Sequence, residues 1–222
     1  MEKLRFFPKV VFTVPLFGRT VPVTETVVVT WGIMLVLMAL GFAAGKNLEQ
    51  FPGRFQNAVE VFYEAIEGLV KSAMGEGKEG FVPYMGTLGL YILTANMIGL
   101  FTLRPPTADL STTLTLAGIT FALTQYENIS SRGIKGYIKS FFEPLPFMFP
   151  LNIIGAVANP VSMAFRLFGN ILGGMVIMGL VYSVVPAVVP VPLHFYFDIF
   201  AGVLQAFIFV MLTMTLIATA AE

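Results

Sequence analysis

The sequence predicts an all-α polytopic membrane protein, with about five transmembrane helices and one amphipathic surface helix. Of the 222 residues, 56% are hydrophobic and only 12% are charged, and the mean hydropathy is +0.82. Soluble domains carry about 25% charged residues, so a soluble fold of this composition could not cover its surface with polar groups. Several uncharged runs are also long enough to cross a bilayer. We therefore expect one integral membrane domain over residues 1–222.

The first half of the chain contains three apolar runs. Residues 26–45 carry no charge and reach the roughly 20 residues that a spanning helix needs. Residues 81–103 form a second run, which Arg104 and two prolines end. A third, shorter run covers residues 110–127. Asp109 stands directly before it and is expected to be its N-cap.

The last third of the chain is almost free of charge. Between residues 144 and 221 the formal charges are Arg166 and Asp198 alone. This stretch is too long for one span, and prolines between residues 186 and 192 divide it. Two long helices are therefore predicted, at about 151–184 and 193–220.

Residues 54–74 are predicted to form the amphipathic helix. Apolar side chains recur on one helical face, while Glu60, Glu64, Glu67 and Lys71 fall on the other. Interfacial helices that bind lipid by charge are usually rich in Lys and Arg. This polar face is acidic, so it is expected to contact water or a partner protein rather than lipid headgroups. A linker helix that lies along the membrane would show the same pattern.

Composition and motifs exclude several function classes. Net charge is zero, so nucleic-acid binding is not expected. The chain has no cysteine and a single histidine, His194, which leaves little basis for a metal site. It lacks nucleotide-binding loops and hydrolase motifs. We expect no catalysis, cofactor or metal in this chain.

Charge in the loops predicts the orientation of the helices. The 46–80 and 127–143 loops carry most of the loop Lys and Arg residues, which favours placing both inside. The N-terminus is then outside and the C-terminus cytoplasmic, although the basic N-terminal tail argues against this. The N-terminal tail lacks the features of a signal peptide, so residues 26–45 are expected to serve as the insertion signal.

Arg166 is the most informative residue in the sequence. It lies mid-way along a long apolar helix, and an arginine at the bilayer centre costs from about 2.5 to more than 10 kcal/mol. Arginine cannot lose its proton to avoid that cost. The charge therefore either serves a function or forms a buried ion pair with Asp198.

The neighbours of Arg166 favour a functional site. Ser162, Arg166 and Asn170 are spaced four residues apart and share one helix face. Gly169 and Gly173 form a small-xxx-small pair, which allows a second backbone to approach closely. This combination suggests a partner helix facing Arg166.

Four further polar residues are candidates for the same pathway. Asp198 and Gln205 lie seven residues apart, on one face of the last helix. Asp198 is a candidate titratable group at the mouth of an aqueous path, and Gln205 would otherwise make an interhelical hydrogen bond. Asp109 and His194 are candidates for lining an outer vestibule.

The run from Asn159 to Asn170, with RLFGN at residues 166–170, closely resembles the arginine-bearing helix of the a subunit of rotary F-type ATP synthases. Residues 204–213 resemble the final helix of that family. Residues 150–154 and 106–109 fit the family too, so the resemblance extends over essentially the whole chain.

The resemblance implies a role as an ion-channel stator. The absence of a transit peptide favours a bacterial cell membrane, although an organelle-encoded copy would look similar. Partners would be the ring of c subunits, the b-subunit peripheral stalk and the remaining synthase. Arg166 would attract each c-ring carboxylate and keep two offset half-channels apart, while Ser162, Asn170 and Gln205 line the path or support the arginine. The translocated ion would be H+ or Na+. The family fold makes the last two helices a long, tilted hairpin around the ring.

The chain departs from the family pattern at several positions. Met175 stands where some relatives carry a glutamate, and Asp198 where they often carry a histidine. Gly155 and Ala156 replace another frequent glutamate. Asp198 alone could then supply the titratable group of the outer half-channel. The alternative function is a secondary transporter that binds an anionic substrate between Arg166 and Asp198.

Overall fold

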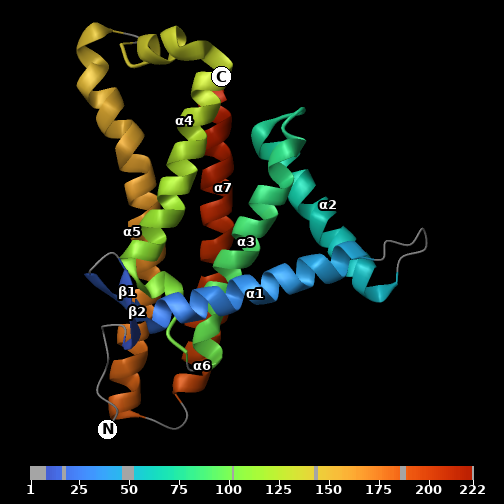
Figure 1. Ribbon diagram of the computed structural model, residues 1–222, viewed down its shortest axis with the longest axis vertical. Helices are drawn as coiled ribbons and strands as arrows, with labels where there is room; N and C mark the ends of the chain where they lie inside the picture. Colours follow the sequence, from blue (N-terminus) through green and yellow to red (C-terminus); the bar gives the residue numbers. More distant parts are fainter. Residues whose placement is uncertain are drawn as a thin grey trace.

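The computed structural model describes residues 9–16, 19–46, 53–101, 103–142, 145–185 and 189–221. Helices dominate this part of the chain (Figure 1). The elements, in chain order, are β1 (Val10–Leu16), β2 (Arg19–Thr24), α1 (Glu25–Lys46), α2 (Arg54–Met74), η1 (Glu79–Phe81), α3 (Val82–Met97), η2 (Ile98–Phe101), η3 (Pro106–Ala108), α4 (Leu110–Ser140), η4 (Pro146–Met148), α5 (Phe149–Val184), α6 (Pro190–His194), η5 (Phe195–Phe200) and α7 (Ala201–Ala221).

Four helical segments in the described part are long and apolar enough to cross a membrane. They are Glu25–Lys46, Glu79–Phe101, Phe149–Val184 and Pro190–Ala220. Each matches a run expected from the sequence to within a few residues. The run at 110–127 is also helical, but it belongs to the longer α4, which carries more polar and charged residues and is not among the four.

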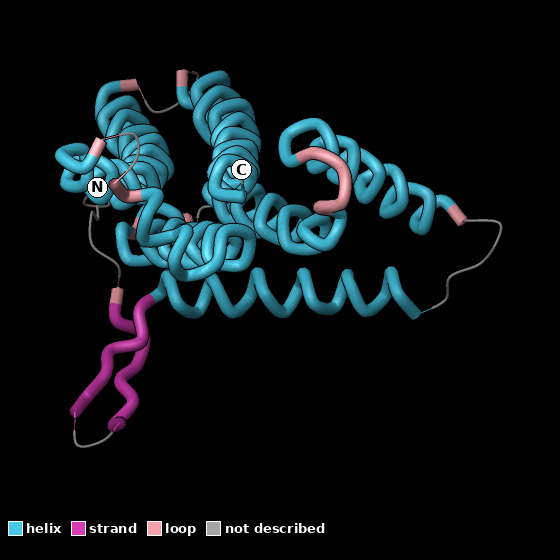
Figure 2. Tube along the Cα trace, turned by 90° about the horizontal axis from the view of Figure 1, so that it is seen from above, coloured by secondary structure: helices cyan, strands magenta, loops and turns pink. Residues whose placement is uncertain are grey.

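The first described elements form a β-hairpin that the hydropathy pattern did not predict. β1 and β2 pair antiparallel, with Leu16 opposite Arg19. Both strands are rich in Val and Thr, whose branched side chains favour extended backbone. The amide of Glu25 donates a hydrogen bond to the carbonyl of Lys9 over 2.8 Å, which closes the base of the hairpin at the start of α1. Figure 2 shows the hairpin projecting away from the helices.

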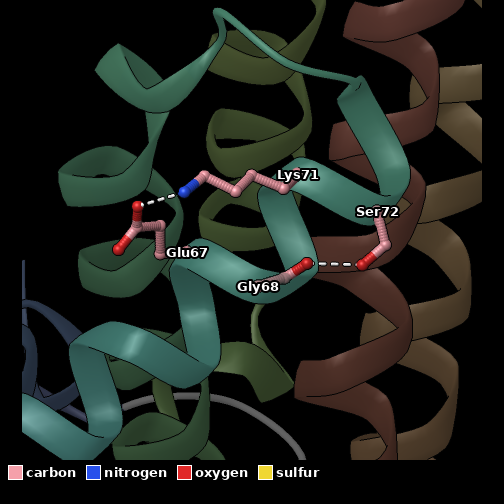
Figure 3. A network of polar contacts seen from close by, with 4 residues as sticks. All are labelled: Glu67, Gly68, Lys71 and Ser72. Carbon is pink, nitrogen blue, oxygen red and sulfur yellow. Dashed lines mark hydrogen bonds and ion pairs between the residues drawn. The ribbon is translucent and has the colours of Figure 1, made fainter.

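α2 is the amphipathic helix, with the bounds expected from the sequence. Val70 and Met74 are buried on its apolar face, while Glu67 and Lys71 form an ion pair of 2.6 Å on the polar face (Figure 3). The hydrogen bond and the charge of Glu67 raise the pKa of Lys71. The pair is exposed to solvent, so salt screens it, and the burial of the apolar face contributes more to the position of α2.

The core lies where α2, α3, α4, α5 and α7 meet. α4 and α7 run side by side between α3 and α5, and α1 lies across them (Figure 1). In α1, only Thr26 and Ile33 are buried, so most of its apolar side chains face outward, as expected of a helix surrounded by lipid. The largest fully buried hydrophobic side chains of the core cluster are Val70, Val82, Met85, Ile92, Leu167, Phe209, Met214 and Ile217.

α4 bends at Gly133, whose φ of 69° and ψ of 165° are not helical. Glycine tolerates this positive φ because it has no Cβ. The last turns of α4 then cross toward the start of α5 (Figure 1). The Tyr137 hydroxyl donates to Gln125 Oε1 over 2.8 Å, across the bend. Asn152 Nδ2 donates to the Phe141 carbonyl over 2.9 Å, which ties the crossing segment to α5.

The two C-terminal helical segments each carry an irregularity. Pro160 lies inside α5 and has no N–H to donate to the carbonyl of Ala156. The last segment contains a π-helical stretch, Phe195–Phe200, between α6 and α7. Single π-turns within α-helices are frequent at functional sites. Both irregularities lie beside cavities.

Candidate functional site

Arg166 occupies an outward-facing position on α5. Its neighbours Met163, Ala164 and Leu167 are buried against the core, which turns the opposite helix face outward. Ser162 and Arg166 are exposed and Asn170 is half-buried. The three side chains follow one another at four-residue intervals, so the polar stripe expected from the sequence lies on the open side of the helix.

The glycines beside Arg166 face open space. A Cβ added at Gly169 or at Gly173 would meet no atom of the described chain within 4 Å. No described helix of this chain therefore occupies the position of the partner helix that the small-residue pair suggested. The face that carries Arg166 is therefore uncovered at these positions within the described residues.

Arg166 and Asp198 do not form an ion pair. Within the part of the chain that the structure describes, no hydrogen bond or ion pair involves the Arg166 guanidinium. Asp198 in η5 instead contacts His194 in α6, with 2.5 Å between Asp198 Oδ2 and His194 Nδ1. The reading of Arg166 and Asp198 as a simple buried pair is therefore wrong for this structure.

A cavity of about 370 Å³, the Asp198 cavity, lies between the C-terminal half of α5 and the start of the last helical segment. Polar and charged groups from several elements line it. They include Asn170 from α5, His194 and Asp198 from the last segment, Asn96 from α3, Arg104, and Glu25 at the base of the hairpin. Gly99 lies close to Asp198, since a Cβ there would be 3.4 Å from the carboxylate oxygen Oδ1.

A second cavity of about 230 Å³, the Asn152 cavity, lies near the N-terminal half of α5. Its polar lining residues are Thr124, Gln125, Asn128, Ser140, Asn152, Asn159 and Thr219. Asn128 Oδ1 is buried and accepts no hydrogen bond from any described residue. A buried oxygen without a partner in a polar cavity is a place where an ordered water is expected.

Arg166 lies between the two cavities along α5. The Asn152 cavity extends along α5 to Pro160, and the Asp198 cavity begins at Asn170. Ten residues of helix separate these limits, which corresponds to about 15 Å. Arg166 lines neither cavity. Two separate polar cavities therefore lie on either side of the exposed arginine along α5.

Asp109 occupies the N-cap position of α4, but its side chain does not cap the helix. Its carboxylate accepts a hydrogen bond from Thr26 and forms an ion pair of 2.8 Å with Arg104 Nη2. Asp109 is therefore the N-cap residue expected from the sequence, but its carboxylate bonds to Arg104, five residues earlier, and to Thr26 instead of to the first turn of α4. Asp109 lines a separate cavity of about 270 Å³ between α1 and α4, whereas Arg104 lines the Asp198 cavity.

Gln205 is buried in α7 with 6% of its surface exposed, and lines neither the Asp198 nor the Asn152 cavity. The structure therefore brings Asn170, His194 and Asp198 together, but leaves Ser162, Arg166, Gln205 and Asp109 outside their cavity. The described residues contain no cluster of three or more His, Asp or Glu that could hold a metal ion.

Two residues of the Asp198 cavity were not found from the sequence. The Tyr182 hydroxyl lies 2.7 Å from His194 Nε2, and Asn96 is buried beside Gly202. In the sequence, Asn96 was recognisable only as a polar residue within the apolar run at 81–103. Tyr182 gave no signal, because an aromatic residue near the end of a membrane helix is typical of the interface.

Comparison with known proteins identifies the family. The family described as "ATP synthase A chain" matches residues 27–218. ATP synthase subunit a of Propionigenium modestum, described as sodium ion specific, is 41% identical over 212 residues, covering 88% of this chain and 73% of that protein. Subunit a of Moorella thermoacetica is 38% identical over 199 residues, covering 89% and 91%. The chain, a multi-pass membrane protein, therefore belongs to the ATP synthase A chain family, and its role is that of the a subunit of an F-type ATP synthase.

Proposed function

We propose that this a subunit passes ions to and from a rotating ring of c subunits through two aqueous half-channels. The Asp198 cavity and the Asn152 cavity are the protein's contributions to these half-channels. The observation that supports the proposal is the placement of Arg166 on α5 between two cavities that do not join. The chain itself carries out no catalysis and couples ion flow to rotation.

Arg166 has two tasks in this proposal. Its guanidinium keeps its charge at any physiological pH, so it attracts an ionised carboxylate that passes on the ring. It also opposes the direct passage of a cation from one cavity to the other. Each ion must then travel with the ring, and the membrane potential supplies about 2.3 kcal/mol per charge for every 100 mV.

The ring would contact the uncovered face of α5. Gly169 and Gly173 leave space for a partner backbone beside Arg166, and Ser162 and Asn170 extend the polar stripe along it. Small residues at helix interfaces allow close approach in a membrane, where packing rather than water exclusion drives association. This arrangement suits a surface past which other helices slide.

The remaining assignments follow from the same role. The b-subunit stalk is the expected second partner within the membrane, and the membrane is that of a bacterial cell, with the N-terminus outside. The ion is H+ or Na+. The Propionigenium relative is named as sodium ion specific, but carboxylates that carry the ion on the ring lie outside this chain.

A secondary transporter with an Arg166–Asp198 substrate site is less well supported. The two side chains are not paired within the described residues, and Arg166 does not line the Asp198 cavity. A substrate bound in that cavity would not contact the arginine.

The test is ATP-driven ion pumping in membrane vesicles that contain the complex with Arg166→Ala. We expect pumping to disappear while the c ring still co-purifies. Arg54→Ala provides the control, because Arg54 is an exposed arginine at the start of α2. Normal pumping by an assembled Arg166→Ala complex would overturn the proposal.

A further inference from the structure

We propose that Tyr182 and His194 form, together with Asp198, a hydrogen-bonded proton relay along the wall of the Asp198 cavity. The inference rests on the proposed half-channel and names the groups through which protons reach the carboxylate there. Tyr182 and His194 act as positioning and relay residues, and Asp198 is the proton acceptor.

The three side chains form a continuous chain between two helical segments. The Tyr182 hydroxyl at the end of α5 lies 2.7 Å from His194 Nε2 in α6. His194 Nδ1 lies 2.5 Å from Asp198 Oδ2, one turn later in η5. The tyrosine and imidazole rings are 5.8 Å apart between centroids. All three residues line the cavity.

Hydrogen-bond chemistry gives the relay a direction. An ionised carboxylate only accepts hydrogen bonds, so His194 must donate from Nδ1 to Asp198. A neutral imidazole then has an acceptor at Nε2, which the Tyr182 hydroxyl satisfies as donor. Every donor in the chain therefore points from Tyr182 toward Asp198.

Proton delivery balances along this chain. A proton from cavity water binds the Tyr182 oxygen as the hydroxyl proton moves to Nε2, and the Nδ1 proton moves to Asp198. Asp198 becomes a neutral carboxylic acid, and His194 remains neutral with its proton on Nε2. Proton release runs through the same bonds in reverse: the Asp198 proton moves to Nδ1, the Nε2 proton moves to the Tyr182 oxygen and the hydroxyl proton leaves to water, which restores the first tautomer and the ionised carboxylate.

Exposure to solvent falls in the order that a relay requires. Tyr182 is exposed, whereas His194 and Asp198 are half-buried, with 33% and 20% of their side chains exposed. The tyrosine is thus the group that water reaches most easily. The carboxylate is the least accessible of the three and depends most on a relay.

The local fold holds Asp198 in this arrangement. Phe197 packs against Gly174 of α5, where a Cβ would approach the Phe197 ring edge to 3.4 Å. The π-helical stretch from Phe195 to Phe200 sets the direction of the Asp198 side chain relative to α7.

Other charged groups line the cavity without joining the chain. Lys9 and Glu25 reach it from the base of the hairpin, and Arg104, which is paired with Asp109, reaches it from the segment after α3. None of them is bonded to His194 or Asp198 within the described residues. The relay therefore depends on Tyr182 and His194 themselves.

The relay conducts protons and has no use for a metal cation. We therefore expect the complex to acidify inverted vesicles in sodium-free buffer. Tyr182→Phe should slow ATP-driven acidification about fivefold, the effect of one lost hydrogen bond. His194→Ala should slow it about tenfold or more, and added imidazole should restore much of the rate, because a free imidazole can bridge the gap. Tyr196→Phe is the matched control, since Tyr196 makes ring contacts with Phe197 and Phe200.

Three results would overturn the relay. They are a strict sodium requirement for pumping, normal pumping by both Tyr182→Phe and His194→Ala, or a slowed His194→Ala complex that imidazole does not restore. If the His194→Ala complex does not assemble, the pumping rate of Tyr182→Phe tests the relay by itself. This variant removes a single oxygen atom and leaves the ring in place. Arg166→Ala separates the two proposals: if it abolishes pumping while the relay variants pump normally, the relay is wrong and the half-channel function stands.

Discussion

Asn96 of α3 donates a hydrogen bond from Nδ2 to the backbone carbonyl of Gly202, over 3.0 Å, at the point where α7 begins. Its Oδ1 accepts a second bond of 2.8 Å from the Thr107 hydroxyl in η3. Asn96 and Thr107 are almost completely buried. One amide thus joins three segments beside the Asp198 cavity.

Asn96→Ala should destabilise the protein by about 2 kcal/mol, because the Thr107 hydroxyl loses its acceptor and the Gly202 carbonyl its side-chain donor in a buried place. Thermal unfolding of the purified complex measures the change. Thr87→Ala is the control, since the exposed Thr87 hydroxyl bonds only to the Pro83 carbonyl of its own helix. Equal stability of the two variants would mean that the hydrogen bonds of Asn96 make no net contribution to the free energy of unfolding.

Gly202→Ala should destabilise the complex by about 1–3 kcal/mol through overpacking. A Cβ at Gly202 would lie 3.2 Å from Asn96 Cβ, so α3 and α7 would have to separate slightly. Gly118→Ala adds the same methyl group in α4, where no atom lies within 4 Å, and should be neutral or slightly stabilising because alanine favours helix. The close approach of α3 and α7 would be disproved if Gly202→Ala behaved like Gly118→Ala in the same thermal measurement.

Asp109→Asn should cost about 2 kcal/mol, because the largely buried guanidinium of Arg104 loses the charge of its partner. The side chains of Arg104 and Asp109 are 9% and 15% exposed, so solvent screens the pair only weakly. Glu64→Gln, on the exposed face of α2, removes the same charge and should have little effect. Chemical denaturation of the detergent-solubilised complex would show the difference, and matching midpoints would contradict it.

Asp198→Asn should reduce ATP-driven proton pumping about tenfold or more with the complex assembled, because an amide cannot take up the translocated proton. Asp198→Glu keeps a carboxyl group and should retain more of the activity. Fluorescence quenching by a pH-sensitive dye in inverted vesicles measures both rates. Unchanged pumping by Asp198→Asn would remove this carboxylate from the path.

The sequence predicted the elements that hydropathy and charge decide directly. The amphipathic helix was found with its bounds, and α1 and α5 within a few residues, because their signals are local and periodic. The β-hairpin was missed, since two short strands that each contain a proline give no such signal. Asp109 was correctly predicted as the N-cap residue of α4, but the pairing of its carboxylate with Arg104 and Thr26 was not predicted, because it depends on how three segments fold together.

The sequence by itself determined that the protein lies in a membrane, which helices it forms and that an arginine lies within one of them. These properties follow from the transfer free energy of individual side chains and from local helix geometry. Only the tertiary structure decided that Arg166 faces outward between two separate cavities, and that Asp198 pairs with His194 and, through it, with Tyr182. The contact between Tyr182 and His194 joins two helical segments, and the position of Arg166 depends on which face of α5 the core covers, so both are decided by how the helices pack. His194 and Asp198 lie one turn apart in a single segment, and the structure decided only that their side chains meet.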